Sequence, residues 1–472
     1  MTDLTRREFL SRGTKAAAGA AVAAGAVMNA IKPQNVLGAN DRINVAVMGI
    51  RSRGRKHYQE WVGIPGVKVK TLCDVDENLF PECVKELEEL QGKKPKTEFD
   101  IRNVLEDKDI DVLSIATTDH WHALATIWAC QAGKHVYVEK PISHNIWEGR
   151  KMVEAARKYN RCVAVGMQSR SLKSVISAMK FLHEGKLGEI YMAKGLCFKP
   201  RDSIGRFPDG PLSEERDIYV WGNKLPHCDV DYLKKVHYDL WLGPAPLRPF
   251  NPNRFHYNWH WFWDYGCADI GNQGPHEMDI ARWGMNKRVH PKKIKCVGGY
   301  YAFDSDQETP NTQFATFEYD DGKIIQFEVR GLYTNAEDDI LIGNLFFGTE
   351  GWMHLNENVW KTYFGRNNEP GPSSSDLMAE EASDPNDLSG TGSTSHFINF
   401  IDTLRSGNWM NLTADVLDGH ISTAMCHLAN ISYRLGRELT FDSNSEKFIQ
   451  DEVANSYLTR NYRYPYVVPE KV

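Results

Sequence analysis

The sequence lacks three features that would narrow its class at once: paired cysteines, an excess of positive charge and a long, strongly apolar run. Its nine cysteines include no Cys-x-x-Cys pair, which argues against a disulfide framework and a zinc site, so we predict no metal. The formal net charge of −6 leaves no basic excess to neutralise phosphates, which argues against nucleic acid as a partner. With 472 residues, 42% hydrophobic and 25% charged, the chain has a globular composition and room for two domains.

An Ala-rich segment near the N-terminus is apolar but too short to span a membrane. It covers the 15 residues Ala16–Ala30, whereas a spanning helix needs about 20 strongly apolar ones. The stretch "TRREFLS" precedes it, and two adjacent arginines before such a run are typical of a twin-arginine export signal. We therefore expect residues 1–40 to be a signal peptide and linker, the protein to be periplasmic, and the mature protein to have no stable membrane span.

Residues 41–168 alternate between strand and helix patterns. Short apolar runs such as "INVAVMGI" and "DVLSIATT" are typical of buried parallel strands, and helical segments separate them. Alternation at this spacing predicts an α/β domain of the Rossmann type, with a parallel, doubly wound sheet and right-handed crossovers.

The first strand leads into "GIRSRG", which departs at one position from the dinucleotide-binding pattern Gly-x-Gly-x-x-Gly. Gly49 and Gly54 hold the first and last places, and Arg51 holds the second, where glycine lets the backbone approach a pyrophosphate. Arg51 must therefore turn its Cβ away from the nucleotide or contact the phosphate with its guanidinium. We assign Gly49, Ile50, Arg51 and Gly54 to a cofactor site.

Asp74 supports a dinucleotide as the ligand of this turn. It follows the second strand, 25 residues after Gly49, where a carboxylate can bind both ribose hydroxyls. The same charge repels a 2′-phosphate, which favours NAD over NADP. Arg51 or Arg53 is a cation that could contact such a phosphate, so NADP stays open as the alternative. Because a periplasm offers little free NAD, we expect the cofactor to stay tightly bound.

Residues 169–472 show a different pattern. Runs such as "QFATFEYD" and "KIIQFEVRGLY" alternate with period two, which indicates antiparallel strands with one covered face. Between the strand-like runs "IYMAKGLCFK" and "KIKCVGGYYAF" lies a long excursion, Pro200–Arg288, in which seven of the eleven residues of Phe255–Tyr265 are aromatic. Aromatic faces beside polar groups bind pyranose rings well, which favours a carbohydrate substrate; packing in the core or at a subunit interface is the alternative.

Two longer segments carry a family resemblance: "IATTDHWHALATIWACQAGKHVYVEKP" and "NQGPHEMDIARW". With the glycine-rich turn, they make the chain from about Ile43 to its C-terminus resemble the glucose–fructose oxidoreductase / inositol dehydrogenase / MocA family. The resemblance implies that residues 169–472 form an α+β domain with a large, mostly antiparallel open sheet used for oligomer contacts. It therefore implies a homodimer or homotetramer.

The resemblance also implies roles for single residues. Lys140 would lie beside the nicotinamide and the substrate hydroxyl, supported by Glu139, and His276 would exchange the proton as general base or acid. The nicotinamide and its ribose would be lined by Ala116, Thr117, His122 and Gln168. Pro141 strengthens this interpretation of Lys140, because it ends the strand and leaves Lys140 at the carboxyl edge of the sheet, where open α/β sheets bind ligands.

One position departs from the family pattern. Many members carry Asp four residues before the His, where this chain has Asn272. An amide orients an imidazole but does not neutralise its charge, so we expect a lower pKa for His276, with Asp269 or Asp264 as candidates for the missing charge. The candidate substrate contacts are Arg170, Lys199, Arg201, His256, Trp259, Trp261, Asn272 and His276. Arg201 is equally suited to a salt bridge, and His256 and His260, four residues apart, lack an acidic third metal ligand.

These features predict an NAD-dependent oxidoreductase that transfers hydride between nicotinamide and a ring hydroxyl or ketone of a sugar or sugar-like polyol. The alternative is an NAD-retaining glycoside hydrolase that acts through transient C3 oxidation and elimination, and the same two residues would serve it. A non-catalytic sugar-binding protein is a third interpretation, and the presence of both Lys140 and His276 argues against it.

Overall fold

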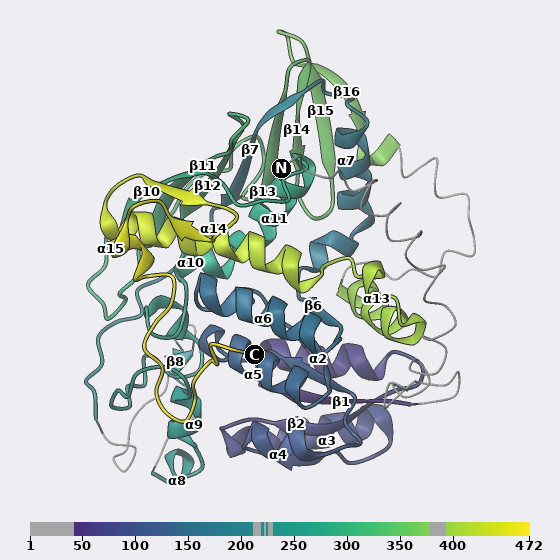
Figure 1. The fold of residues 1–472 in the computed structure, drawn as a ribbon, viewed down its shortest axis with the longest axis vertical. Coiled ribbons are helices and arrows are strands. Elements are labelled where there is room, and N and C mark those ends of the chain that lie inside the picture. Colours follow the sequence, from purple (N-terminus) through teal and green to yellow (C-terminus); the bar gives the residue numbers. More distant parts are fainter. Residues whose placement is uncertain (1–41, 211–218, 221–222, 225–229, 377–392) are drawn as a thin grey trace, which may run out of the picture. The chain divides into compact units, whose positions relative to one another are not determined.

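The computed structural model describes residues 42–210, 219–220, 223–224, 230–376 and 393–472 (Figure 1). The predicted export signal, residues 1–40, lies outside these ranges. None of the helices in the described ranges combines the length and the apolar character needed to cross a membrane.

The first half of the described chain forms a six-stranded parallel sheet in the order β3-β2-β1-β4-β5-β6. The strands are β1 (Ile43–Met48), β2 (Val67–Cys73), β3 (Lys96–Glu98), β4 (Val112–Ile115), β5 (His135–Val138) and β6 (Val163–Val165). The helices between them are α2 (Ser52–Val62), α3 (Phe80–Gln91), α4 (Ile101–Glu106), α5 (Asp119–Gln131) and α6 (Ile146–Lys158). The order reverses between β1 and β4, which is where open α/β sheets form a ligand crevice. The predicted doubly wound Rossmann fold is confirmed.

The second half contains a ten-stranded sheet in the order β16-β15-β14-β13-β7-β12-β11-β10-β17-β18. Only the β12–β7 pair is parallel, which confirms the prediction of a large, mostly antiparallel sheet. The strands are β7 (Ile190–Cys197), β10 (Lys293–Gly299), β11 (Thr312–Glu318), β12 (Ile324–Arg330), β13 (Ile342–Gly348), β14 (Gly351–Leu355), β15 (Trp360–Phe364), β16 (Glu369–Ser373), β17 (Leu439–Asp442) and β18 (Lys447–Phe448).

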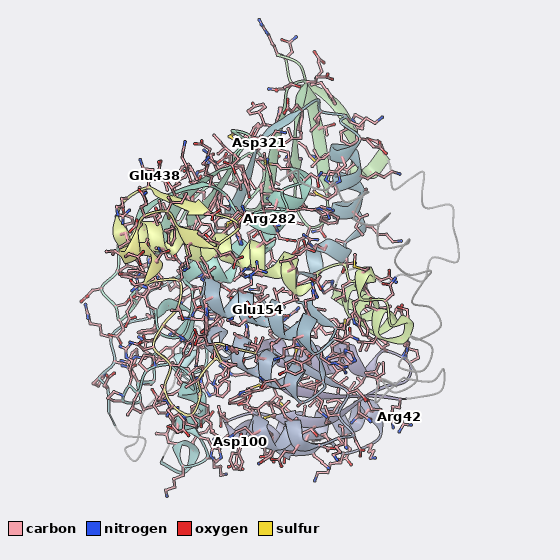
Figure 2. All side chains as sticks on the ribbon, viewed as in Figure 1. Arg42, Asp100, Glu154, Arg282, Asp321 and Glu438 are labelled. Carbon is pink, nitrogen blue, oxygen red and sulfur yellow. The ribbon has the colours of Figure 1, made fainter. Side chains whose placement is uncertain are left out.

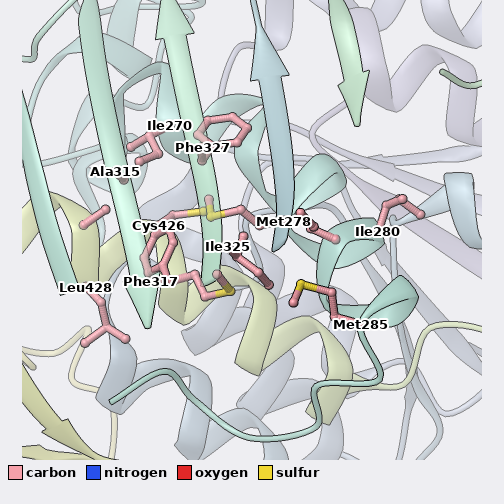
Figure 3. Packing of buried hydrophobic residues seen from close by; sticks show 14 of the residues in the cluster. Ile270, Met278, Ile280, Met285, Ala315, Phe317, Ile325, Phe327, Cys426 and Leu428 are labelled. Carbon is pink, nitrogen blue, oxygen red and sulfur yellow. The ribbon is translucent and has the colours of Figure 1, made fainter. Parts of the chain in front are cut away.

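Helices α11 (Gly274–Gly284) and α14 (Val416–Leu435) cover one face of this sheet. Every second side chain of β11 and β12 is buried, and Phe317, Ile325 and Phe327 pack against Met278 of α11 and Leu428 of α14 (Figure 3). A polar contact also links the two helices, because Arg282, labelled in Figure 2, donates to Ser422 Oγ at 2.6 Å. This packing fixes α11, the helix that carries the second of the family-like segments.

Helix α14 also contacts α6 of the parallel-sheet half, so it lies between the two sheets (Figure 1). Helix α13 (Ser393–Ser406) contacts α2 in the same half. Elements from the C-terminal end of the chain therefore pack on the Rossmann half. For that reason the division of the chain at residue 168 stays a prediction.

Candidate active site

A cavity of about 650 Å³ lies at the carboxyl ends of β1, β2, β4 and β5. Its wall includes Gly49 after β1, Asp74 after β2, Thr117 after β4 and Lys140 after β5. The volume falls in the range of small-molecule and cofactor sites. The position agrees with the crevice expected where the strand order reverses.

At the two glycines of the glycine-rich turn, the surrounding atoms leave no space for a Cβ. Gly49 has φ +80°, and a Cβ there would lie 2.6 Å from Ala116 O; a Cβ on Gly54 would lie 1.7 Å from Gly49 O. Arg51 has φ −82° and ψ 170°, an extended conformation that any residue adopts. The backbone therefore tolerates a side chain at the second position of the pattern, and Arg51 lines the cavity.

The Arg51 guanidinium lies near the acidic end of the cavity. Burial lowers its pKa, and the charges of Tyr232, Asp76 and Asp74 oppose that change. Asp74 accepts hydrogen bonds from the backbone N–H of Ile50 at 2.9 Å and of Asp76 at 3.0 Å. Burial raises the pKa of Asp74 to about 6. The contacts with Ile50 and Asp76 hold the carboxylate at the end of β2.

Part of the aromatic excursion contributes to the cavity wall from the second half of the chain. Phe255, His256, Tyr257 and Trp259 line the cavity, and His256 Nε2 lies 3.0 Å from Asp76 Oδ2. Phe255 and Trp259 also belong to a hydrophobic core cluster, so the core interpretation is confirmed for these two residues, and sugar binding by the aromatic block stays a prediction. Backbone oxygens of the same excursion accept from the Rossmann half, for example Leu240 O from Trp121 Nε1 at 3.0 Å.

Lys140 lies at the opposite end of the cavity, directly after β5. Its Nζ donates to the backbone carbonyl of Asn272 and lies 3.4 Å from Asn272 Oδ1. Burial lowers the pKa of Lys140, and the carboxylates of Glu139 and Asp119 oppose that shift. The ammonium is therefore anchored to α10 (Ala268–Asn272), the short helix just before α11.

Glu139 is held by its own set of partners. Its Oε1 lies 2.7 Å from Arg53 Nε and 3.0 Å from His57 Nε2. Although burial opposes ionisation, the charge of Arg53 and the hydrogen bond from His57 keep the pKa of Glu139 well below its usual value. The carboxylate packs over Gly166, where a Cβ would lie 2.6 Å from Oε1. Glu139 thus stays charged beside Lys140.

His276 lies near the start of α11 and lines the same cavity. Its side chain is buried, and Nδ1 has no hydrogen-bond partner among the described residues. Burial is the main cause that lowers the pKa of His276 to about 3, and the charge of Lys140 is the second. A neutral imidazole at this position can accept a proton but does not carry a charge of its own.

Neither aspartate that we considered as a substitute for the missing carboxylate faces His276. Asp269 is paired with Arg201, with Nη2 and Oδ1 2.8 Å apart, and Asp264 accepts from Arg248 at 2.8 Å. The structure instead brings a different carboxyl group, Asp119, into the cavity wall. Sequence analysis did not single out Asp119, which directly follows the predicted strand "DVLSIATT".

Most predicted site residues line the cavity together: Gly49, Arg51, Asp74, Ala116, Thr117, His122, Glu139, Lys140, Gln168, His256, Trp259, Asn272 and His276. Two lie in the turn just outside its wall, Ile50 and Gly54. Four others lie elsewhere: Arg170, Lys199, Arg201 and Trp261.

The four outer residues make contacts within the protein. Arg170 Nε binds Asp279 Oδ2 at 2.6 Å, and Lys199 Nζ binds Gln273 Oε1 at 2.6 Å. The Arg201 guanidinium, paired with Asp269, lies over the Trp261 ring, 4.9 Å from its centroid. Their part in substrate binding stays a prediction, and their observed contacts support the walls around α10 and α11.

One group within the described ranges has the composition of a metal site: His290, His420 and Glu446. It does not line the cavity. Both histidines contact Glu446 Oε1, at 2.7 and 2.8 Å, and Arg150 binds both carboxylate oxygens of Glu446. Arg150 therefore already supplies the positive charge that a cation would add, and the group is an ion-pair network that joins α6 to the second half.

Two family descriptions match this chain. "Oxidoreductase family, NAD-binding Rossmann fold" matches residues 43–167, and "Oxidoreductase family, C-terminal alpha/beta domain" matches residues 218–339 and 390–468. A glycosyl hydrolase family 109 protein of Shewanella baltica (strain OS155) is 24% identical over 206 residues, which cover 40% of this chain and 45% of the relative. The chain thus spans less than half the length of the curated relatives it matches.

Solved structures share the fold at lower identity. The WlbA dehydrogenase from Bordetella pertussis, in complex with NADH and UDP-GlcNAcA, aligns with a TM-score of 0.59 and 18% identity, over 85% of this chain and 99% of that one. A levoglucosan dehydrogenase in complex with NADH and levoglucosan aligns with a TM-score of 0.60 and 18% identity, over 85% and 99%. These likenesses show the shared fold, and the two family matches, which cover more than half of the chain, show that it belongs to the Gfo/Idh/MocA oxidoreductase family.

Proposed function

We propose that this protein is an NAD-dependent oxidoreductase that transfers hydride between nicotinamide and a ring hydroxyl or ketone of a sugar or sugar-like polyol. The observation that carries the proposal is a single cavity with Asp74 at one end and Lys140 and His276 at the other. The NADH and sugar ligands named for the two structural neighbours support it.

The residues of the cavity fit an NAD molecule. The cradle at Gly49 and Gly54 leaves no space for a Cβ, which suits close approach of a pyrophosphate. Arg53 Nη2 and Gln168 Oε1 are buried polar atoms without partners among the described residues, so a ligand can satisfy them. Asp74 would bind the ribose hydroxyls. Bound NAD supplies a hydride acceptor at nicotinamide C4, and NADH a donor.

The proton is handled by the protein. The Lys140 ammonium, positioned by Asn272 and flanked by Glu139, donates to the substrate hydroxyl oxygen and so lowers the pKa of that hydroxyl. The neutral imidazole of His276 accepts the proton during oxidation and returns it during reduction. The aromatic walls exclude water and present flat faces to the sugar ring.

We also propose that the protein prefers NAD to NADP and retains the bound nucleotide rather than exchanging it with solution. A 2′-phosphate beside Asp74 and Asp76 would meet two carboxylates, with Arg51 as the nearby cation. The contact between His256 and Asp76 holds the excursion against this end of the cavity, which would slow nucleotide release.

Extraction of the purified protein and mass analysis of the extract test the cofactor. We expect the extract to contain NAD. When a panel of sugars is then added to the purified protein, we expect at least one of them to reduce the bound nicotinamide, which absorbance measures. A protein that carries no nucleotide and binds none when NAD is added would contradict the proposal.

The second candidate is a glycoside hydrolase that retains NAD and acts through transient C3 oxidation and elimination. The family 109 relative favours it, and Tyr257 adds a phenol to the cavity wall. Release of free sugar from an aryl glycoside without net NADH would select this reaction. Release of oxidised sugar with stoichiometric NADH would select the first.

Export and assembly complete the proposal. The "TRREFLS" pattern supports twin-arginine export to the periplasm, and replacing Arg6 and Arg7 by lysine should keep the protein in the cytoplasm. The half-exposed side chains on one face of β11 and β12 support a homodimer or homotetramer through the large sheet. Light scattering should then give two or four times the mass of the mature chain, and a monomer would contradict it.

A further inference from the structure

A second, smaller cavity adjoins the start of α11. Its volume is about 20 Å³, and its wall contains His276 and Glu277, the third and fourth residues of that helix. His276 also lines the main cavity. One imidazole therefore borders both cavities.

The second cavity has room for water and extends toward the protein surface. About 10–15 Å³ is enough to hold one water molecule, and the cavity exceeds that volume. Asn356 and Glu357, which follow β14, complete a polar part of its wall, and Glu357 is exposed. A water molecule in this cavity can therefore exchange protons with solvent on the β14 side.

Two buried polar atoms belong to the residues of this wall. His276 Nδ1 and Glu277 Oε2 have no hydrogen-bond partner in the part of the chain that the structure describes, and the two residues are 7% and 5% exposed. Buried polar atoms of native proteins are nearly always bonded to protein or to ordered water. A water molecule in the second cavity can satisfy both atoms at once.

The other oxygen of Glu277 is already occupied. Lys199 Nζ lies 2.6 Å from Gln273 Oε1, and because an ammonium only donates, this contact fixes the orientation of the Gln273 amide. Gln273 Nε2 then donates to Glu277 Oε1 at 3.0 Å, while Asn344 Nδ2 donates to the backbone carbonyl of Glu277 at 2.8 Å. Oε2 is thus the oxygen left for a ligand.

The same contacts indicate where Glu277 carries its proton. Its carboxyl group is bound by a neutral amide, and burial raises its pKa to about 8, so it is mostly protonated at neutral pH. Because Oε1 accepts an N–H, the proton lies on Oε2, which becomes a donor. A water molecule that accepts from Oε2 has a second lone pair, which suits an N–H at His276 Nδ1.

We propose that a water molecule in the second cavity accepts hydrogen bonds from His276 Nδ1 and Glu277 Oε2, and that Glu277 is a positioning residue that sets the tautomer of His276. The inference rests on the proposed function and deepens it. With one proton fixed at Nδ1, Nε2 keeps its lone pair and is the atom that accepts the substrate proton.

The water also gives the proton a route that avoids the substrate. During oxidation, the hydroxyl proton moves to His276 Nε2 while the carbinol hydrogen leaves as hydride to nicotinamide. Nδ1 then passes its own proton to the water, which releases a proton toward Glu357 and solvent. Reduction runs the same transfers in reverse. The proton can therefore leave or enter while a sugar fills the main cavity.

A crystal structure of the purified protein, at a resolution that shows ordered water, tests the site without any substrate. We expect one water within about 2.7–3.2 Å of both His276 Nδ1 and Glu277 Oε2. A second cavity without this water overturns the inference.

Nuclear magnetic resonance of protein labelled with ¹⁵N in its imidazole rings tests the tautomer. The signals of His276 are those that disappear in His276→Gln. We expect the Nδ1–H tautomer in the wild type and in Glu277→Gln, because the Gln amide donates to the same water. Glu277→Met, of similar length but without a donor, should lose the fixed tautomer. An Nε2–H tautomer in the wild type, or an unchanged tautomer in Glu277→Met, overturns the inference.

Steady-state kinetics gives the functional result. Glu277→Met should lower kcat by roughly 10- to 100-fold, as for loss of a group that orients a functional imidazole, and leave NAD affinity unchanged. Glu277→Gln should stay close to the wild type, and a loss as large as in Glu277→Met would contradict a positioning role. Glu184→Met, at an exposed glutamate just after α7 (Lys173–His183), is the matched control.

Failure of the inference and failure of the proposed function give different results. Sugar oxidation by a protein whose second cavity lacks the water rejects only the role of Glu277. The water and the Nδ1–H tautomer in a protein that neither binds NAD nor oxidises any sugar support the water site and reject the oxidoreductase. Should Glu277→Met fail to fold, the wild-type crystal structure and tautomer decide.

Discussion

The two ends of the cavity are built in different ways. At the nucleotide end, Ile50 N–H and the Asp74 carboxylate that accepts from it are 24 residues apart, at the ends of two adjacent strands. At the other end, Lys140 contacts Asn272, which lies 132 residues further along the chain. The nucleotide end is therefore largely a product of local backbone geometry, whereas the reacting end exists only once α10 and α11 have packed on the Rossmann half.

This difference matters for how each end tolerates change. The nucleotide end depends on conformations that few residues adopt, such as φ +80° at Gly49, but its side chains can vary, as Arg51 shows. The reacting end depends on the charge balance of a few buried groups. We therefore expect substitutions at the nucleotide end to reduce mainly NAD affinity, and substitutions at the reacting end to reduce mainly kcat.

The largest effect should come from Lys140→Ala. Without the ammonium, the substrate hydroxyl loses the donor that lowers its pKa, and kcat should fall by roughly 10²–10⁴-fold. NAD affinity should change far less, because the glycine turn and Asp74 remain. Steady-state kinetics with NAD titration measures both, and full activity in the variant would remove the catalytic assignment. Lys186→Ala, an exposed lysine outside the cavity, is the matched control.

Gly54→Ala should have the opposite pattern, with a larger effect on NAD affinity than on the chemical step. Its Cβ would lie 1.7 Å from Gly49 O, so the turn must move away from its binding geometry. Since a displacement of about 1 Å in a positioned site costs roughly 100-fold, we expect NAD affinity to fall by about that factor. Gly63→Ala, at the other end of α2 with its nearest contact at 3.3 Å, should bind NAD normally. Equal affinity of the two variants by calorimetry would argue against the turn as the pyrophosphate site.

The parts of the molecule that could be predicted from sequence follow the same division. The hydrophobic period and the residue spacing were enough to predict the Rossmann sheet and the positions of Gly49 and Asp74 at its edge, because strand ends and tight turns are local features. Lys140 could be placed at the edge of the sheet because Pro141 ends its strand. The pairing of Arg201 with Asp269 could not be predicted, since it depends on how a long excursion folds back.

Asp119 illustrates the harder case. An acidic residue at the start of a helix is ordinarily explained by the helix dipole, so its identity alone carries no functional signal. Its burial and its place in the cavity wall become visible only in the structure. The aromatic block is similar, because Phe255 and Trp259 serve both the core and the cavity wall, and composition does not separate these uses.

Asp74→Asn should have a smaller effect, confined to the nucleotide end. Loss of the charged acceptor for the ribose hydroxyls should cost about 2 kcal/mol, or roughly 30-fold in NAD affinity, and reduce the preference for NAD over NADP. In the wild type, the carboxylate takes up a proton as the pH falls through about 6, so NAD affinity should decrease over that interval. The variant should lack this dependence. The same pH dependence in both proteins would exclude Asp74 as its origin.

The smallest effect should come from Arg51→Gly, which restores the glycine of the common pattern. The guanidinium lies among Asp74, Asp76 and Tyr232, so part of its charge is already neutralised by the protein, and partly solvated ion pairs contribute about 1 kcal/mol or less. We expect release of bound NAD to become faster by no more than about fivefold. Stopped-flow release after dilution into excess competing nucleotide measures this rate. A slower release would mean that Arg51 hinders the nucleotide and that the extended backbone at this position merely accommodates it. A much larger acceleration would mean that the guanidinium reaches the pyrophosphate, and the nucleotide end would then depend on a side chain as strongly as the reacting end does.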